Sequence, residues 1–285
     1  MEEYQIGLQM YAVKHVAEDD LITTLKKIKK IGYNAIELVG YYSFSPGAIR
    51  QITKKIGLVI PSVHVPLRIY DEQKIEKDFE RSAQFVAEVG SRNIVIPWLP
   101  IREKIKQHEV VFLQQLLKTL AKIAANHKIQ LVLHNFSREF MTVDSDRFVI
   151  DQIIENLDEH QIRLELDIGK IYMNGHDPVE VYNRYESRTQ FLHLRSVKEG
   201  RSDCLLEHGV IDYKRILPQL NNLKDKVMYI EQQVHLQRAL EDAQMNFQYV
   251  TQILQASGGQ ARADVGQYQS GTHGMNNGQK YQNQY

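Results

Sequence analysis

Short apolar runs alternate with amphipathic stretches along this chain, from residue 6 to about residue 254. The runs are rich in Val, Ile and Leu and nearly continuous in apolar residues, as expected for parallel strands covered on both faces. They are IGLQMY (6–11), AIELV (35–39), LVIPSVHV (58–65), NIVIPW (93–98), IQLVLHN (129–135), IRLELDI (162–168), FLHLRS (191–196) and VMYIEQQ (227–233). The pattern predicts a parallel sheet.

The stretches between these runs have helical spacing. Leu21, Leu25 and Ile28 recur at intervals of three or four residues, which places them on one face of a helix. A second such stretch covers residues 111–124. Three predicted helices are followed by a glycine that suits a left-handed C-cap: Gly32, Gly57 and Gly90. Helices therefore connect the strands.

Eight strand–helix units in about 250 residues are typical of an α/β fold, the (β/α)₈ TIM barrel. An open, doubly wound sheet would alternate in the same way. It is disfavoured because the segment after the first strand, YAVKHVAEDD, contains no glycine-rich phosphate loop. We predict a single barrel domain over residues 1–255. Residues 256–285 are rich in Gly, Gln, Asn and Tyr and nearly lack aliphatic side chains, so we predict a disordered tail there.

Composition narrows the class of partner. The chain has 35 basic and 35 acidic residues, and this balance disfavours binding to nucleic acid or to a membrane surface. The single cysteine excludes an internal disulfide, and the acidic N-terminus does not resemble a signal peptide. We expect a cytoplasmic protein that acts on a small molecule, with no nucleic-acid or membrane partner.

In parallel barrels the functional side chains lie at the C-terminal ends of the strands. The polar residues at or just beyond those ends are Glu37, His64, His134, Asn135, Glu139, Asp167, Lys170, His193, Arg195, Glu231 and Gln232. Asp167 and Glu231 each close an apolar run, and a buried carboxylate is costly unless it is paired or bound to metal. With His193 on a neighbouring strand, they predict a site for one divalent ion such as Mn²⁺, Co²⁺, Zn²⁺, Fe²⁺ or Mg²⁺.

Five motifs in this order resemble those of the sugar phosphate isomerase/epimerase family, the xylose-isomerase-like TIM barrels. They are IGLQMYAVKH, LVLHNFSREF, ELDIGKIYMNGHDP, FLHLRS and MYIEQQ. The resemblance covers roughly residues 5–250. It implies metal ligation by Asp167, His193, Glu231 and one group of the fifth strand, with Glu231 also a proton-transfer base. Arg195 stands where relatives often have a basic residue that contacts substrate oxygens.

The sequence departs from the family pattern in two places. The fifth-strand ligand is commonly a glutamate where His134 stands, while Glu139 matches the later glutamate of the family's HNHxxEF motif, so both remain candidates. Lys170 stands where relatives commonly have histidine or an aromatic residue. It is a candidate substrate contact or general acid, with a solvent-exposed loop position as the alternative.

The resemblance implies a metal-dependent isomerase or epimerase of a sugar or polyol ketone. A bound ion would stabilise an enediolate formed when Glu231 or Glu139 removes a proton. A dehydratase of the inosose type shares these early steps and remains an alternative. His64 and Trp98, at the ends of the third and fourth strands, are expected to line the substrate pocket, and Arg68 is a weaker candidate for an anionic group. Family members often form oligomers, so a homo-oligomer is possible.

Two rival classes share the fold. An apurinic-site endonuclease needs more histidines at the strand ends and more basic surface than this chain has. A non-catalytic sugar-binding barrel is favoured by Lys170 and by the absence of glutamate at His134. The intact set of Asp167, His193 and Glu231 opposes it.

Overall fold

The computed structural model describes residues 3–40, 42–67, 72–136, 138–144, 147–199, 202–232, 234–257 and 260–261. Eight parallel strands form a closed barrel, because the last of them pairs back with the first. In barrel order they are β1 (Glu3–Gln9), β2 (Ala35–Val39), β3 (Val59–His64), β4 (Asn93–Ile96), β5 (Gln130–His134), β8 (Arg163–Asp167), β9 (Thr189–Leu194) and β10 (Val227–Ile230). The (β/α)₈ barrel predicted from the sequence is confirmed.

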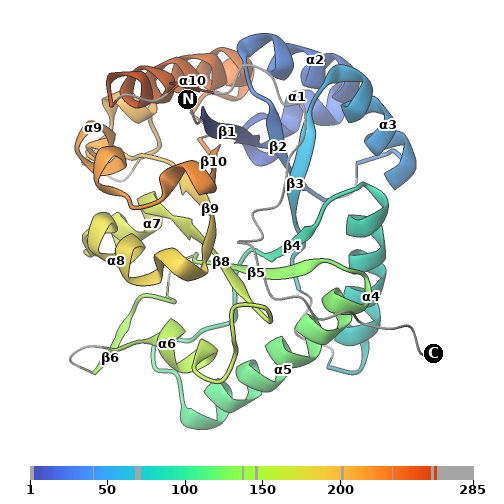
Figure 1. Ribbon diagram of the computed structural model, residues 1–285, viewed down its shortest axis with the longest axis vertical. Helices are drawn as coiled ribbons and strands as arrows, with labels where there is room; N and C mark the ends of the chain where they lie inside the picture. Colours follow the sequence, from blue (N-terminus) through green and yellow to red (C-terminus); the bar gives the residue numbers. More distant parts are fainter. Residues whose placement is uncertain are drawn as a thin grey trace, which may run out of the picture.

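Helices surround the barrel on its outside (Figure 1). They are α1 (Lys14–Asp19), α2 (Leu21–Ile31), α3 (Pro46–Ile56), α4 (Glu72–Glu88), α5 (Gln107–Asn126), α6 (Val149–Ile154), α7 (Ile168–Met173), α8 (Pro178–Tyr185), α9 (Tyr213–Ile216) and α10 (Ala239–Ala256). Short 3₁₀ helices are η1 (Met10–Val13), η2 (Glu186–Arg188), η3 (Leu206–His208), η4 (Leu217–Gln219), η5 (Leu223–Asp225) and η6 (Leu236–Arg238). The predicted C-caps have positive φ angles, and Gly57 adopts the left-handed conformation at φ +82°. A two-stranded antiparallel ribbon, β6 (Thr142–Asp144) and β7 (Arg147–Phe148), precedes α6.

Alternation along each strand divides the buried side chains into two sets. In β8, Leu164 and Leu166 pack into the large apolar layer between barrel and helices. Glu165 and Asp167 alternate with them and point into the barrel, where both are fully buried. The apolar part of the barrel interior is small: Ala35, Val95, Val132, Phe191, Val227 and Tyr229. The rest of that interior is polar.

The chain ends differ from the sequence predictions in detail. The first strand ends at Gln9, and Met10 and Tyr11 begin η1 instead. Helix α10 extends to Ala256, and Gln260–Ala261 form β11, which pairs with Glu3 and Tyr4 of β1. The start of the segment predicted to be a disordered tail is therefore regular, because Glu3 and Tyr4 precede the residues of β1 that pair with β10 and β2 and so offer it backbone partners. Residues 262–285 lie outside the described residues. Over the described part of the chain, no helix combines the length and apolarity needed to span a bilayer.

Candidate metal centre and active site

Four of the predicted side chains converge at the C-terminal ends of neighbouring strands. We call them the upper group: His134, Asp167, His193 and Glu231. They end β5, end β8, lie within β9 and follow β10, respectively. One ligand atom from each lies within 4.8 Å of the others, and all but Glu231 are buried. Asp167, His193 and Glu231 are the ligands that the resemblance implied, and His134 is one of the two fifth-strand candidates, the other being Glu139.

His134 is held in a form that suits metal binding. Its Nδ1 lies 2.9 Å from the Pro97 carbonyl oxygen, so Nδ1 carries the hydrogen and Nε2 offers a lone pair. Burial, and then the charges of His193 and His64, hold the pKa of His134 well below its usual value. Its Nε2 is buried and finds no hydrogen-bond partner among the described residues. A neutral imidazole with one fixed N–H and one free nitrogen is a metal ligand's usual state.

Asp167 presents a second unpaired atom. Its Oδ1 accepts a hydrogen bond of 2.9 Å from the Lys170 backbone N–H and caps α7. Its Oδ2 is buried, 3.9 Å from His134 Nε2, and has no hydrogen-bond partner within the described parts of the chain. Burial raises the pKa of Asp167 to about 6, although the charge of Arg195 opposes this rise. Leaving buried polar atoms unpaired is costly. A cation bound in the upper group would give both His134 Nε2 and Asp167 Oδ2 a partner.

Glu231 is the member that solvent reaches. Its Oε2 lies 3.0 Å from His193 Nδ1 and 3.7 Å from Arg195 Nη1, and its side chain is 17% exposed. Burial alone would raise the pKa of Glu231, but the His193 hydrogen bond and the charges of His193 and Arg195 lower it to about 2. The Glu231 carboxylate is therefore ionised at neutral pH.

A second cluster, the lower group, consists of Glu37, His64, Glu165 and His193. Its members pair with one another: His64 Nε2 lies 2.7 Å from Glu165 Oε2 and 3.0 Å from Glu37 Oε2. His193 Nε2 lies 2.8 Å from Glu37 Oε2 and 3.2 Å from Glu165 Oε1. Burial would lower the pKa of His64, but the Glu37 and Glu165 carboxylates raise it to about 10. The lower group is thus a network of ion pairs inside the barrel.

Sequence reasoning missed Glu165. The available signal was its spacing, because Glu165 lies two residues before Asp167 and so shares the inward face of the same strand. Ser62 and Tyr229 were missed as well. They precede His64 and Glu231 by two residues and join the lower group by hydrogen bonds.

The remaining candidates lie around the two groups. Lys170 Nζ lies 4.3 Å from the centroid of the Phe136 ring, and Trp98, 44% exposed, lies 6.4 Å from that ring between centroids. Glu139 belongs to neither group, and its Oε2 accepts hydrogen bonds of 3.0 Å from the backbone N–H groups of Phe136 and Arg138. Arg68 lies outside the described residues.

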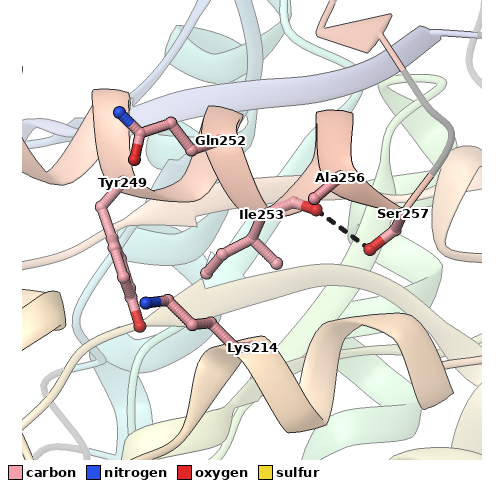
Figure 2. Close-up of a pocket in the computed structure, with 6 residues that line it drawn as sticks. All are labelled: Lys214, Tyr249, Gln252, Ile253, Ala256 and Ser257. Carbon is pink, nitrogen blue, oxygen red and sulfur yellow. Dashed lines mark hydrogen bonds between the residues drawn. The ribbon is translucent and has the colours of Figure 1, made fainter.

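A surface pocket elsewhere contains none of these residues. It lies between α9 and α10 and is lined by Lys214, Tyr249, Gln252, Ile253, Ala256 and Ser257 (Figure 2). Its lining is mostly apolar in area and includes no carboxylate and no histidine, so it offers no chemistry comparable to that of the two groups. The candidate active site is therefore the barrel mouth.

Comparison with known proteins agrees with this architecture. Residues 25–250 match the family described as xylose isomerase-like TIM barrel, and the chain belongs to that family. A curated relative, inosose dehydratase of Geobacillus kaustophilus, is 25% identical over 201 residues, or 65% of this chain and 63% of the relative. The chain thus spans less than two thirds of that relative's length.

Solved structures show the same fold at low sequence identity. A sugar phosphate isomerase/epimerase from Parabacteroides distasonis superposes with a TM-score of 0.73 at 20% identity, covering 87% of this chain and 96% of that one. A 3-keto-D-glucoside 4-epimerase from E. coli has a TM-score of 0.68 at 16% identity, covering 87% of this chain and 99% of that one.

Proposed function

We propose that this protein is a metal-dependent isomerase or epimerase that moves a proton beside the carbonyl group of a sugar or polyol ketone. The observation that supports this most is a pair of buried atoms in the upper group, His134 Nε2 and Asp167 Oδ2. They lie 3.9 Å apart, and neither has a hydrogen-bond partner in the described structure. When bound, a divalent ion supplies a Lewis acid that stabilises negative charge on substrate oxygens. Mn²⁺, Co²⁺, Zn²⁺ and Mg²⁺ are all candidates for the mixed imidazole and carboxylate ligands.

Glu231 is the base in this proposal. It is ionised, and it is the partly exposed carboxylate of the two groups, whereas Glu37, Glu165 and Asp167 are fully buried. A proton acceptor has to reach the substrate carbon, and Glu231 meets that requirement. Glu139, the other candidate base, has one carboxylate oxygen occupied by two backbone N–H groups.

Other residues at the mouth bind and orient the substrate. Arg195 reaches both Asp167 and Glu231 and can donate to substrate oxygens beside them. Burial, and then the charge of Arg195, lower the pKa of Lys170, which makes it a stronger proton donor than an exposed lysine. The exposed rings of Trp98 and Phe136 form an apolar wall for the C–H face of a sugar. His64 has its Nε2 between two carboxylates, so any substrate contact falls to the rest of its ring.

A dehydratase of the inosose type is the second candidate, favoured by the curated relatives of that name. The first step is the same removal of a proton beside the carbonyl. In an isomerase or epimerase a carbon is then reprotonated. In the dehydratase the hydroxyl group on the next carbon instead accepts a proton and leaves as water. In this second proposal Lys170 supplies that proton.

Deuterium exchange tests the shared step before the outcome is known. The protein, loaded with Mn²⁺ or Zn²⁺, is incubated in D₂O with a panel of ketoses, keto-glycosides and inososes, and NMR follows the carbon beside the carbonyl. Exchange with a new epimer or isomer supports the first proposal, whereas loss of water to an enone supports the second. Metal binding without exchange on any of these compounds contradicts the proposal and favours a non-catalytic barrel, and the Glu231→Gln variant serves as the exchange-free control.

A further inference from the structure

His193 belongs to both groups, and its two ring nitrogens face different carboxylates. Nδ1 lies 3.0 Å from Glu231 Oε2, in the upper group. Nε2 lies 2.8 Å from Glu37 Oε2, in the lower group, and farther, 3.2 Å, from Glu165 Oε1. An imidazole binds an ion through the nitrogen that carries no hydrogen, and the partner of the other nitrogen decides which one that is. The orientation of His193 is therefore set from below.

The carboxylate of Glu37 is held on both of its oxygens. Its Oε1 accepts a hydrogen bond of 2.5 Å from the Ser62 hydroxyl, which in turn lies 2.8 Å from the Tyr229 hydroxyl. Its Oε2 also lies 3.0 Å from Nε2 of His64, which Glu165 holds from the other side. These contacts come from β3, β8 and β10, so three other strands fix the position of a side chain on β2.

The Tyr229 ring in this network depends on a glycine. A Cβ atom at Gly7, on β1, would lie 2.6 Å from two atoms of the ring. Such a distance is far inside van der Waals contact, so the absence of a side chain at Gly7 makes room for Tyr229. The order of contacts then runs from β1 through Tyr229, Ser62 and Glu37 to His193.

We propose that Glu37 is a positioning residue of the metal centre. Its carboxylate accepts the Nε2 hydrogen of His193 and so turns Nδ1 toward the upper group as the free nitrogen. Ser62, His64 and Glu165 keep Glu37 in place. This inference rests on the proposed function, since it requires an ion in the upper group. It also implies that the lower group is not a second ion site, because His193 Nε2 cannot donate its hydrogen to Glu37 and bind an ion at once.

The test compares the wild-type chain with Glu37→Gln, which keeps the size of the side chain and removes its charge. Affinity for Co²⁺ is measured by competition with a chromophoric chelator, together with the visible spectrum of the bound Co²⁺. We expect one ion per chain in both proteins, an affinity about 10- to 100-fold weaker in Glu37→Gln, and an altered spectrum. In the Zn²⁺ form of the ¹⁵N-histidine-labelled wild type, NMR should show His193 protonated at Nε2.

Two further variants keep the result interpretable. Asp242→Asn changes another buried carboxylate, 1% exposed and 3.1 Å from His235 Nδ1, outside both groups, so it should bind Co²⁺ like the wild type. Ser62→Ala should weaken binding in the same direction as Glu37→Gln but by less, and it replaces Glu37→Gln should that variant fail to fold.

Each contrary outcome has a distinct meaning. Wild-type affinity in Glu37→Gln, or a His193 protonated at Nδ1 in the Zn²⁺ form, overturns the positioning role and leaves the proposed function standing. Two ions in the wild type, one of them lost in Glu37→Gln, overturn it in favour of a second metal site. No ion in the wild type at all removes the proposed function, and the positioning role with it.

Discussion

The upper and lower groups share His193 and the same barrel interior, yet their polar atoms are satisfied very differently. In the lower group two carboxylates and two imidazoles pair at 2.7–3.0 Å, and Glu165 Oε1, which has no hydrogen-bond partner in the described chain, still lies 3.2 Å from His193 Nε2. In the upper group His134 Nε2 and Asp167 Oδ2 lie 3.9 Å apart, and neither finds a hydrogen-bond partner within the described chain. Both groups are composed of histidine and carboxylate, so residue type alone does not distinguish them.

The difference follows from depth in the barrel. Inward-facing residues lie in layers, and Glu165 lies two residues before Asp167 on the same strand, so it is one layer deeper; Glu37 and Glu165 are both fully buried. Because these two carboxylates are removed from water, their charges have to be neutralised by the neighbouring imidazoles. The next layer opens at the mouth, where an external cation can complete the set. Charge pairing therefore fits a supporting role for the lower group, and the two unpaired atoms that lie 3.9 Å apart in the upper group fit a cation site.

Removal of an upper-group ligand should have the largest effect. Asp167→Ala and Glu231→Ala each delete a charged side chain of the proposed ligand set. We expect metal affinity to fall by more than about 100-fold, a larger loss than for Glu37→Gln, and we expect activity to be lost. Elemental analysis after dialysis measures the bound ion. Metal retained at one per chain in both variants would place the ion elsewhere and break the comparison.

Gly7→Ala should damage the lower group without removing a ligand. The added Cβ collides with the Tyr229 ring, and overpacking of this kind costs about 1–3 kcal/mol of unfolding free energy. Thermal unfolding of the metal-free protein measures the loss, and metal stoichiometry should stay unchanged. Gly47→Ala is the control, since nothing outside its chain neighbours and the backbone of its own helix lies within 4 Å of its Cβ position. Equal Tm values for the two variants would show that Tyr229 does not need the space at Gly7.

The pH dependence of metal affinity separates the groups further. Burial raises the pKa of Asp167 to about 6, so protons compete with the ion for this carboxylate below that pH. Burial would lower the pKa of His193, but Glu165 and Glu37 raise it well above its usual value. The ion therefore displaces one proton from His193 both above and below pH 6, in addition to the Asp167 proton that it displaces below pH 6. As the pH is lowered, metal affinity should decrease about tenfold per pH unit above pH 6 and about a hundredfold per unit below pH 6. Chelator competition from pH 5 to 8 measures this, and a constant slope would contradict the raised pKa of Asp167.

Trp98→Leu should have the smallest effect, because Trp98 is 44% exposed and belongs to neither group. Loss of its ring face should raise KM several-fold and leave kcat and metal affinity nearly unchanged. Steady-state kinetics on whichever substrate shows deuterium exchange measures this. A fall in kcat with unchanged KM would assign Trp98 to the chemistry and not to binding.

The eight barrel strands could be predicted from sequence because they are buried on both faces and read as continuous apolar runs. The same rule located the upper group, since Asp167 and Glu231 interrupt such runs where the strands end. The strand limits were less predictable: Met10 and Tyr11 are as apolar as the strand they follow, and only backbone pairing with neighbours shows where that strand ends.

Glu165 could not be assigned a role from sequence because its function depends on residues far away in the chain. Its partner His64 is 101 positions distant, and closure of the barrel brings them to 2.7 Å. The choice between His134 and Glu139 was equally inaccessible. The structure places His134 in the upper group, and Glu139 on the backbone of the turn that follows β5.

Anomalous diffraction from crystals of the wild-type protein grown with Co²⁺, recorded at the cobalt absorption edge, tests the central claim most directly. A single anomalous peak among His134, Asp167, His193 and Glu231, with none among Glu37, His64 and Glu165, is the result that this account predicts. A peak inside the lower group, or no peak at either place with Co²⁺ in excess, would contradict it.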